Sequence, residues 1–301
     1  MRAGGLLRRD LEPDVQPQSA APGASAMIGE RLSPANFHRL AQLVHDHSGI
    51  KMPPSKKTML EGRLRRRMRA HRLNDVNAYC RYLFEENGLE SELVHVIDAV
   101  TTNKTEFFRE PSHFAFVTDR CLPGFLAEGR RVIRAWSAAA SIGAEAFTLA
   151  MVFEAFCAEH RGLDYRILGT DLSTEVLRQA VRGIYPEAMI APVPPALRQR
   201  YLMRARLAER REVRIAPQLR AKTAFARLNL MDERYPAPDD MDLIFCRNIL
   251  IYFDKPTQAA VLRRLCAHLR PGGYLFLGHS ESLLGVDLPV TAVGNTVFQR
   301  V

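Results

Sequence analysis

The carboxylate of Asp171 occupies a position where a doubly wound sheet places a ligand-binding acid. The run Tyr165–Asp171 (YRILGTD) has the apolar character of a buried strand and ends on this acid. At the end of the second strand of such a sheet, an acid accepts hydrogen bonds from ribose hydroxyls. The alternative is that Asp171 only caps the helix that follows, although Ser173 could do this instead.

A turn of small residues lies between an earlier strand and its helix. The apolar run Val132–Trp136 is followed by small residues from Ser137 to Ser141, and a helical pattern begins at Gly143. A turn of this kind presents backbone N–H groups to a ligand at the carboxyl edge of an open α/β sheet. Taken alone, an ordinary strand-to-helix connection explains this segment equally well.

A polar segment before the sheet is a second candidate. Residues 101–110 (TTNKTEFFRE) are dense in hydroxyls, contain an amide and include Arg109. The segment lies between two helical stretches, just before the sheet, so we expect it to line a cleft between domains. Its Thr and Asn residues could also cap a turn, with Phe107 and Phe108 in the core.

Strands and helices alternate over the second half of the chain and must position these groups. The pattern predicts strands at 132–138, 165–171, 241–246 and 271–281, and helices at 143–160, 173–183 and 256–269. The polar pair Arg247–Asn248 follows the third strand, and Tyr252 comes soon after it. Residues 184–227 break the alternation with clustered prolines and short strand-like runs, which indicates an inserted β-subdomain. We expect a last strand at 296–301 to be an edge.

The first half divides into a tail, a helical domain and a linker. Residues 1–27 are rich in Pro, Ala, Gly and Ser, which is typical of a disordered tail. Ser33 and Pro34 predict the start of a helix that Gly49 ends. Two more amphipathic helices fit residues 79–100. We therefore expect a helical domain at 28–100, a linker at 101–130 that carries the polar segment, and a sheet domain at 131–301.

The net charge of +9 is concentrated in one stretch, Lys51–Arg72. This stretch holds nine Lys or Arg residues and one acid, Glu61. Apolar residues at helical spacing leave the arginines on the opposite face. Crowding of like charges destabilises a helix, so the density favours a docking surface for an acidic partner over a merely solvated face.

Composition limits the remaining possibilities. The five cysteines are widely spaced without zinc-binding patterns, so we expect a reduced, cytoplasmic protein. His45 and His47 have no third ligand nearby, and we expect no metal site. No apolar run is long enough for a membrane span, and the N-terminus lacks the pattern of a signal peptide.

Five segments together resemble the chemotaxis receptor methyltransferases, the CheR family. They are TTNKTEFFRE, WSAAASIGAEAF, ILGTDLSTEVL, IFCRNILIYFD and PGGYLFLGHSE, in the order and spacing of that family. The resemblance covers about residues 30 to 301. It implies an α/β fold: a Rossmann-like domain that uses S-adenosylmethionine (SAM), with a small inserted β-subdomain, preceded by a small all-α domain.

The resemblance also implies an activity and a set of site residues. Members of the family methylate glutamate side chains on the cytoplasmic helices of chemoreceptors and release S-adenosylhomocysteine (SAH). The positions that it assigns to the cofactor are Asn103, Thr105, Arg109, Glu145, Asp171, Asn229, Leu230, Arg247 and Asn248. Of these, Asp171 would hold the ribose, Asn229–Leu230 would border the adenine, and Arg247–Asn248 would lie beside the methionyl end.

The implied chemistry suits these residue types. A glutamate carboxyl has a reference pKa of about 4.3, so the nucleophile is already ionised at neutral pH and needs no general base. Opposite charges cancel as a carboxylate oxygen attacks the sulfonium methyl, so an ordered cleft that excludes water favours the reaction. Arg109 and Tyr252 are the catalytic candidates beside the reacting carboxylate.

The resemblance implies that the basic helix docks the receptor, because methylated receptor helices are rich in Glu. The predicted docking residues are Arg63, Arg65, Arg66, Arg67 and Arg69. We expect a monomer that neither binds nucleic acid nor inserts into a membrane. The alternatives are a scaffold that binds SAM or SAH without turnover and an RNA methyltransferase, which the scarcity of aromatics on the basic face disfavours.

The turn at 139–146 departs from the family pattern G-C-S-T-G-E-E-P. It keeps the glycine at Gly143 and an acid at Glu145, but has Ala139 and Ile142 in place of Gly and Thr. Ala139 is compatible with the turn only if its φ is negative and its methyl group clears the ligand. We therefore expect cofactor binding at this turn, weaker than is usual in the family.

Overall fold

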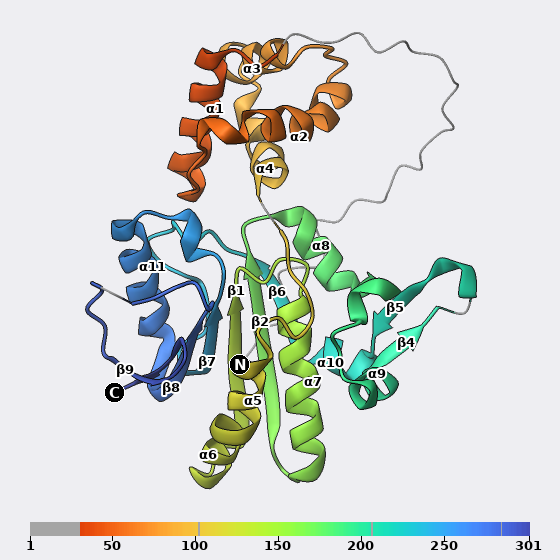
Figure 1. The fold of residues 1–301 in the computed structure, drawn as a ribbon, viewed down its shortest axis with the longest axis vertical. Helices are drawn as coiled ribbons and strands as arrows, with labels where there is room; N and C mark the ends of the chain where they lie inside the picture. Colours follow the sequence, from red (N-terminus) through yellow and green to blue (C-terminus); the bar gives the residue numbers. More distant parts are fainter. Residues whose placement is uncertain (1–30, 102, 206, 284) are drawn as a thin grey trace.

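The computed structural model describes residues 31–101, 103–205, 207–283 and 285–301. The predicted tail at 1–27 lies outside the described residues. A helical domain lies at one end of the molecule, over the carboxyl ends of the central strands, and a small three-stranded sheet projects from one side (Figure 1). Among the described residues, no helix combines the length and apolar character that a membrane span requires.

The helical domain begins where the sequence predicts. The Ser33 side chain accepts a hydrogen bond from the backbone N–H of Asn36, and Gly49 ends the first helix with a φ of 71°. Each helix buries its apolar stripe, including Leu40 and Leu64, in a shared core. The helices are α1 (Pro34–Ser48), α2 (Lys57–Ala70), α3 (Val76–Glu85) and α4 (Leu89–Val100).

The central sheet of the described residues has seven strands in the order β6-β2-β1-β7-β8-β10-β9. The first five of these are parallel, whereas β10 runs antiparallel to both β8 and β9. The strands are β1 (Val132–Ala138), β2 (Asp164–Asp171), β6 (Thr223–Arg227), β7 (Met241–Cys246), β8 (Leu269–Leu277), β9 (Val290–Gly294) and β10 (Val297–Arg300).

Both faces of this sheet are buried, as parallel strands require. On β1, Ile133 and Ala135 join one hydrophobic cluster, and Trp136 and Ala138 join the other. The second cluster is continuous with the core of the helical domain. The covering helices are α5 (Pro111–Phe116), α6 (Leu122–Ala127), α7 (Ala144–Glu159), α8 (Thr174–Arg182), α10 (Pro217–Ala221) and α11 (Lys255–His268).

The inserted subdomain is smaller than predicted. Strands β3 (Ile184–Pro186), β4 (Leu202–Arg204) and β5 (Glu212–Ile215), with helix α9 (Pro195–Tyr201), form it, in the strand order β3-β5-β4. The predicted boundary at residue 227 is wrong, because β6 pairs in parallel with β2 as an edge of the central sheet. A five-residue strand that buries Thr223 and Phe225 resembles the short strands of the insertion too closely for the sequence to separate them.

Two other boundaries need correction. The predicted linker reaches too far, because Phe107, Phe114 and Phe125 belong to the core of the sheet domain. The last strand is not an edge, since β9 pairs along its outer side. Strand β9 is largely exposed, so the sequence lacks the apolar pattern that would have predicted it.

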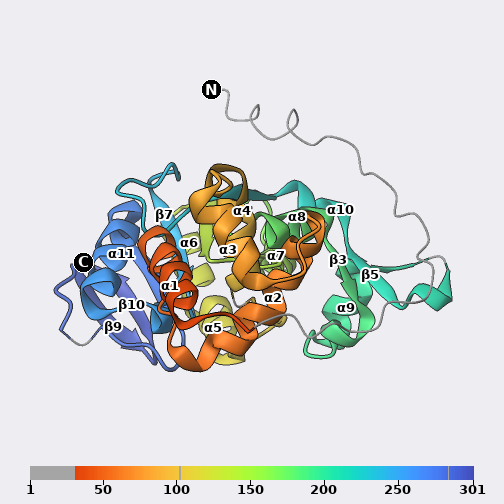
Figure 2. The ribbon, with the colours of Figure 1, turned by 90° about the horizontal axis from the view of Figure 1, so that it is seen from above.

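The order of the strands creates a crevice beside β1. From β1 the chain moves through β2 to β6 in one direction and then returns to β7 on the other side of β1. In an open α/β sheet, ligands bind outside the carboxyl ends of the strands at such a reversal. Helices α1, α2 and α4 lie over this end of the sheet domain when it is seen from above (Figure 2).

Candidate active site

A cavity of about 1050 Å³, counting the part that is open to solvent, lies in this crevice. Its walls come from the carboxyl ends of the strands, from the polar segment and from the helical domain, which contributes Ser48, Ile50 and Lys56. All ten cofactor-binding and catalytic residues predicted from the sequence line it: Asn103, Thr105, Arg109, Glu145, Asp171, Asn229, Leu230, Arg247, Asn248 and Tyr252.

Asp171 connects the two loops that border the cavity. Its Oδ2 accepts a hydrogen bond from the backbone N–H of Ser141 (2.8 Å), and its Oδ1 accepts one from the N–H of Ser173 (2.9 Å). Burial raises the pKa of Asp171, while these backbone bonds oppose the rise. The Ser173 side chain caps α8. Asp171 therefore does more than cap a helix: it orients the β1–α7 turn and faces the cavity.

Arg247 is the centre of a buried charge network at the end of β7. Its Nε donates to Glu145 Oε2 (2.7 Å), and its Nη1 donates to Glu110 Oε2 (3.3 Å) and to His113 Nδ1 (3.0 Å). Burial and the Arg247 charge lower the pKa of His113 to about 4, so its ring is neutral and accepts at Nδ1. Glu145 Oε1 also accepts from the Ser137 hydroxyl (2.6 Å).

Within the described residues, one cluster has the composition of a metal site: Glu110, His113 and His279. The Arg247 guanidinium already lies between Glu110 and His113, and Asn248 Nδ2 donates to the second Glu110 oxygen (3.1 Å). A cation placed there would meet this positive charge at close range. Glu110 and His113 instead hold the Arg247–Asn248 pair.

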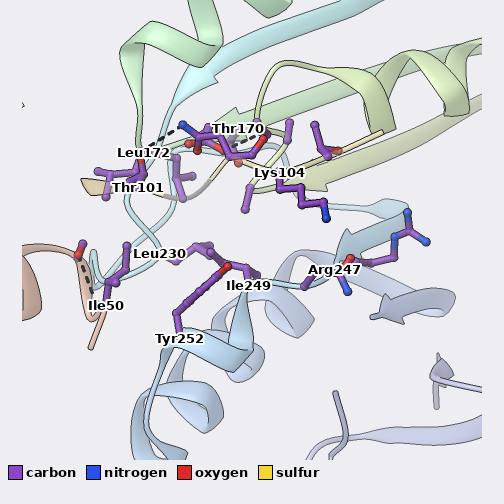
Figure 3. A pocket seen from close by; sticks show the side chains of 18 of the residues that line it. Ile50, Thr101, Lys104, Thr170, Leu172, Leu230, Arg247, Ile249 and Tyr252 are labelled. Atoms are coloured by element: carbon purple, nitrogen blue, oxygen red, sulfur yellow. Dashed lines mark hydrogen bonds between the residues drawn. The ribbon is translucent and has the colours of Figure 1, made fainter. Parts of the chain in front are cut away.

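Besides Arg247, three cationic side chains line the cavity: Lys56, Lys104 and Arg109. Arg109 donates to the Lys104 carbonyl (3.2 Å), and both residues line the cavity. Lys56 Nζ lies 5.4 Å from the centre of the Tyr252 ring. Figure 3 shows Leu230, Ile249 and Tyr252 on one side of the cavity, opposite Thr101, Thr170 and Leu172. The helical domain thus reaches the catalytic candidates directly.

The β1–α7 turn is strained at the position that departs from the family pattern. Ala139 has a φ of 63° and Ser141 a φ of 51°. The condition that Ala139 have a negative φ is not met, because the chain must reverse between β1 and α7 within a few residues. Gly143, with a φ of 86°, is required for packing, since a Cβ there would lie 2.9 Å from Ala180 Cβ and 3.0 Å from the Phe225 ring.

The five arginines predicted for docking divide into two groups. Arg63 donates to the carbonyls of Val100 and Thr101 (3.0 and 2.7 Å), so it holds the end of α4. Arg67 pairs with the buried Glu92, and Arg66 pairs with Glu175 of the sheet domain (2.9 Å). Arg65, Arg66 and Arg69 are all exposed, but Arg65 and Arg69 take part in none of the ion pairs found among the described residues, so a partner can reach them most readily.

Three cavity-facing or supporting groups were missed by the sequence reasoning. Lys56 was assigned only to the basic stretch, and no local signal connects it to the cavity. Glu110 is the last residue of the segment TTNKTEFFRE, and Glu281 is the last residue of PGGYLFLGHSE. Neither acid was among the predicted site residues. Glu281 accepts backbone N–H bonds from both Asn248 (2.8 Å) and Leu250 (2.7 Å), and it lies 33 and 31 residues from them in the chain.

The cavity suits a ligand that is part nucleoside and part amino acid. Asp171 presents a carboxylate at the strand end where ribose hydroxyls bind, and the apolar side chains of Leu228, Leu230 and Phe253 form a surface for a base. Small residues at 139–141 leave room above the turn. The fold and this cavity therefore define an α/β nucleoside-binding protein of the Rossmann-like class.

Comparisons with known proteins make the assignment specific. The family model described as "CheR methyltransferase, SAM binding domain" matches residues 103–298, and "CheR methyltransferase, all-alpha domain" matches residues 35–101. The chain belongs to the CheR methyltransferase family, and its cofactor is SAM.

Curated relatives agree along nearly the whole chain. A chemotaxis protein methyltransferase of Escherichia coli (strain K12) is 38% identical over 267 residues, which cover 89% of this chain and 91% of that protein. Chemotaxis protein methyltransferase 2 of Pseudomonas aeruginosa is 36% identical over 264 residues, covering 87% and 92%. A relative from Borreliella burgdorferi is 35% identical, covering 82% and 88%.

Proposed function

We propose that the protein transfers the methyl group of SAM to glutamate side chains on the cytoplasmic helices of chemoreceptors. The products are a glutamyl methyl ester and SAH, and the reaction serves adaptation in chemotaxis-type signalling. The observation that carries the proposal is the convergence of the ten predicted residues, from segments across the chain, on one cavity at the strand reversal. Membership of the CheR family supports the same reaction.

The cofactor end of the cavity is assigned residue by residue. Asp171 holds the ribose hydroxyls, and Asn229 and Leu230 border the adenine. Arg247, fixed by Glu145 and Glu110, lies at the methionyl end with Asn248. Asn103 and Thr105 close the cavity from the polar segment. Bound SAM supplies a methyl group on a positively charged sulfonium.

The substrate end orients a carboxylate that is already ionised. Arg109 binds one carboxylate oxygen and leaves the other free to approach the methyl group, with Tyr252 beside it. Lys56 and Lys104 increase the local positive potential that attracts the anionic side chain. The helical domain over the cavity limits the access of water, which favours a reaction in which charges cancel.

Helix α2 provides the docking surface for the receptor helix. The exposed Arg65 and Arg69 make the direct contacts with acidic side chains. Arg63, Arg66 and Arg67 belong to the same basic face, and their pairs within the protein fix the position of α2. Contacts between opposite charges speed the diffusional encounter of enzyme and receptor, and they weaken as the salt concentration rises.

The site of action that we propose is the cytoplasm, where the receptor helices lie. In agreement with this, all five cysteines are free thiols. We propose that the protein acts as a monomer, because the ten residues assigned to the cofactor and to the reaction all come from one chain and line one cavity.

The test is a transfer assay with SAM labelled on its methyl group. The purified protein should label a receptor cytoplasmic fragment, and mild base should release the label as methanol. Replacing the methylated glutamates of the fragment by alanine should abolish the label. Calorimetry with SAH, run in parallel, separates the alternatives: binding without transfer indicates a scaffold, and base-stable label on total RNA indicates an RNA methyltransferase.

A further inference from the structure

A buried carboxylate outside the assigned set, that of Glu281, lies behind the loop that carries three site residues. Glu281 follows β8 and is 6% exposed. Its Oε2 accepts hydrogen bonds from the backbone N–H groups of Asn248 (2.8 Å) and Gly278 (2.7 Å), and its Oε1 accepts one from Leu250 (2.7 Å). Glu281 thus connects the end of β8 to the loop between β7 and α11.

Every hydrogen-bonding partner of this carboxylate found among the described residues is a backbone donor, and none of the ion pairs found there includes Glu281. A carboxylate has only acceptor sites, so it satisfies all three N–H groups. A side-chain amide of the same size would direct its NH₂ group at one or two of these donors. The loop therefore requires the ionised carboxylate. Without it, the three buried N–H groups would lack an acceptor.

The backbone that Glu281 holds is close-packed and partly strained. Asn248 has a φ of 58°, a conformation that is uncommon outside glycine. A Cβ on Gly278 would clash with Asn248 Nδ2 and would lie 2.9 Å from both the Asn248 backbone nitrogen and Glu281 Oε2, so the approach of the two segments depends on this glycine. Such strain persists only where the surroundings over-determine the backbone.

The held loop leads directly to Tyr252. Leu250 begins the short helical turn Leu250–Tyr252, and the Tyr252 N–H donates to the Ile249 carbonyl (3.1 Å). The side chain of Asn248 is fixed separately by Glu110 (3.1 Å). Glu281 therefore controls the backbone of the turn, while other groups fix the side chains before it.

We propose that Glu281 is a positioning residue for methyl transfer, which sets the turn that aims Tyr252 at the substrate end of the cavity. This inference rests on the proposed function, because Tyr252 is assigned to the reacting carboxylate there. Glu281 is not among the residues that line the cavity, so contact with cofactor or substrate is not part of its proposed role. It acts through the loop alone.

The central test compares Glu281→Gln with Asp242→Asn in the full chain. Asp242 is fully buried at the opposite end of β7, where it accepts a hydrogen bond from the Arg134 N–H (2.8 Å) and pairs with Arg130 and Arg270. It serves as the control for loss of a buried carboxylate, because it lies on β7 at the end away from the loop and contacts none of the loop residues. At a temperature where both variants are fully folded, we expect kcat to fall by about 10-fold or more for Glu281→Gln and to change less than about 2-fold for Asp242→Asn.

A second background tests whether the effect passes through Tyr252. In the Tyr252→Phe variant, adding Glu281→Gln should lower kcat by less than about 3-fold, because the group that the loop aims is already absent. Equal losses in the two backgrounds, or equal losses for Glu281→Gln and Asp242→Asn, would overturn the proposal. If Glu281→Gln does not fold, Glu281→Asp takes its place with the same criteria, since its shorter side chain withdraws the carboxylate from the N–H groups of Asn248 and Leu250.

Hydrogen exchange gives a readout that does not depend on turnover. Glu281→Gln should speed exchange of the amides at Asn248 and Leu250, whereas Asp242→Asn should leave them unchanged. If the wild-type protein methylates no receptor fragment, the proposed function fails, yet faster exchange would still show that Glu281 holds the loop. Unchanged exchange together with normal wild-type transfer would refute the positioning role alone.

Discussion

Arg247 Nε donates a hydrogen bond to Glu145 Oε2 at 2.7 Å, which joins the end of β7 to the first turn of α7 across the carboxyl end of β1. The pair is almost fully buried, with side chains 2% and 12% exposed. A buried guanidinium needs such partners, and Glu110 supplies a second. The two acids fix the arginine at the wall of the cavity, so its charge is in place before any ligand arrives.

Arg109→Ala should reduce methyl transfer far more than cofactor binding. We expect kcat to fall by about 100-fold, because Arg109 orients the attacking carboxylate, while the Kd for SAH changes less than about 3-fold. Kinetics with labelled SAM and calorimetry with SAH measure the two effects. Arg109→Lys, which keeps the charge but loses the planar fork, should lie between wild type and Arg109→Ala. Near-normal transfer by Arg109→Ala would exclude this role.

Reversing the charge of Arg65 and Arg69 together should weaken receptor docking. We expect the KM for the receptor fragment to rise by about 10-fold and its salt dependence to flatten, with the Kd for SAH unchanged. Arg65 and Arg69 are better targets than Arg67, because removing Arg67 would leave Glu92 buried and destabilise the fold by about 3 kcal/mol. An unchanged KM at low salt would contradict the docking role of α2.

Glu92 should make the stability of the protein depend on pH in the acid range. Hydrogen bonds from Arg67 and Tyr79, against the opposing effect of burial, lower the pKa of Glu92 from 4.5 to about 2. A carboxyl with a depressed folded pKa stabilises the fold above its unfolded pKa and loses that contribution as pH falls. The contribution, about 3 kcal/mol, should therefore disappear between about pH 4.5 and pH 2.

Denaturant unfolding of wild type and Glu92→Gln over this pH range measures that contribution. The difference in the free energy of unfolding between the two proteins should be largest at neutral pH and should shrink as the pH falls toward 2. A constant difference would show that the ionised form of Glu92 is not what stabilises the helical domain.

Ala139→Gly should stabilise the β1–α7 turn. A left-handed conformation costs a non-glycine residue roughly 1–2 kcal/mol, and the extra unfolded-state entropy of glycine offsets about 0.5–1 kcal/mol of the gain. We expect a net increase of about 0.5–1 kcal/mol in the free energy of unfolding and equal or tighter SAM binding. The neighbouring Ala140, which is not in the left-handed region, is the control: Ala140→Gly should destabilise. A loss of stability on Ala139→Gly similar to that on Ala140→Gly would show that the turn is not strained at Ala139.

The parts of the fold that follow from periodicity were predictable. Strand β1, helix α7 and strand β2 carry strong apolar patterns, and the predicted segments match them within two residues at each end. The convergence of Asp171, Arg247 and Tyr252 also followed, because parallel strands present their carboxyl ends at one edge. Short elements were not predictable: β6 and β9 have five residues each, and their pairing depends on the tertiary structure.

The supporting contacts of the site were beyond the sequence for a different reason. Glu281 acts on backbone amides more than 30 residues away, and a backbone amide has no residue type that could reveal the pairing. Arg63, Arg66 and Arg67 look like exposed charges in a basic helix, yet each finds a partner on another element. Charge density alone cannot distinguish such pairs from a free surface.

The shared wall of the cavity has a thermodynamic consequence. Ser48, Ile50 and Lys56 of the helical domain face the same space as Asp171 of the sheet domain, and Asn229 Nδ2 donates to the His47 carbonyl across the junction (2.6 Å). If the receptor docks on α2 as we propose, one domain contacts both receptor and cofactor, and we expect the free energies of their binding to be linked. Linkage is reciprocal: whatever factor the receptor applies to cofactor affinity, the cofactor applies to receptor affinity. SAH lacks only the methyl group and its charge, so the spent enzyme keeps most of that coupling until the cofactor is exchanged.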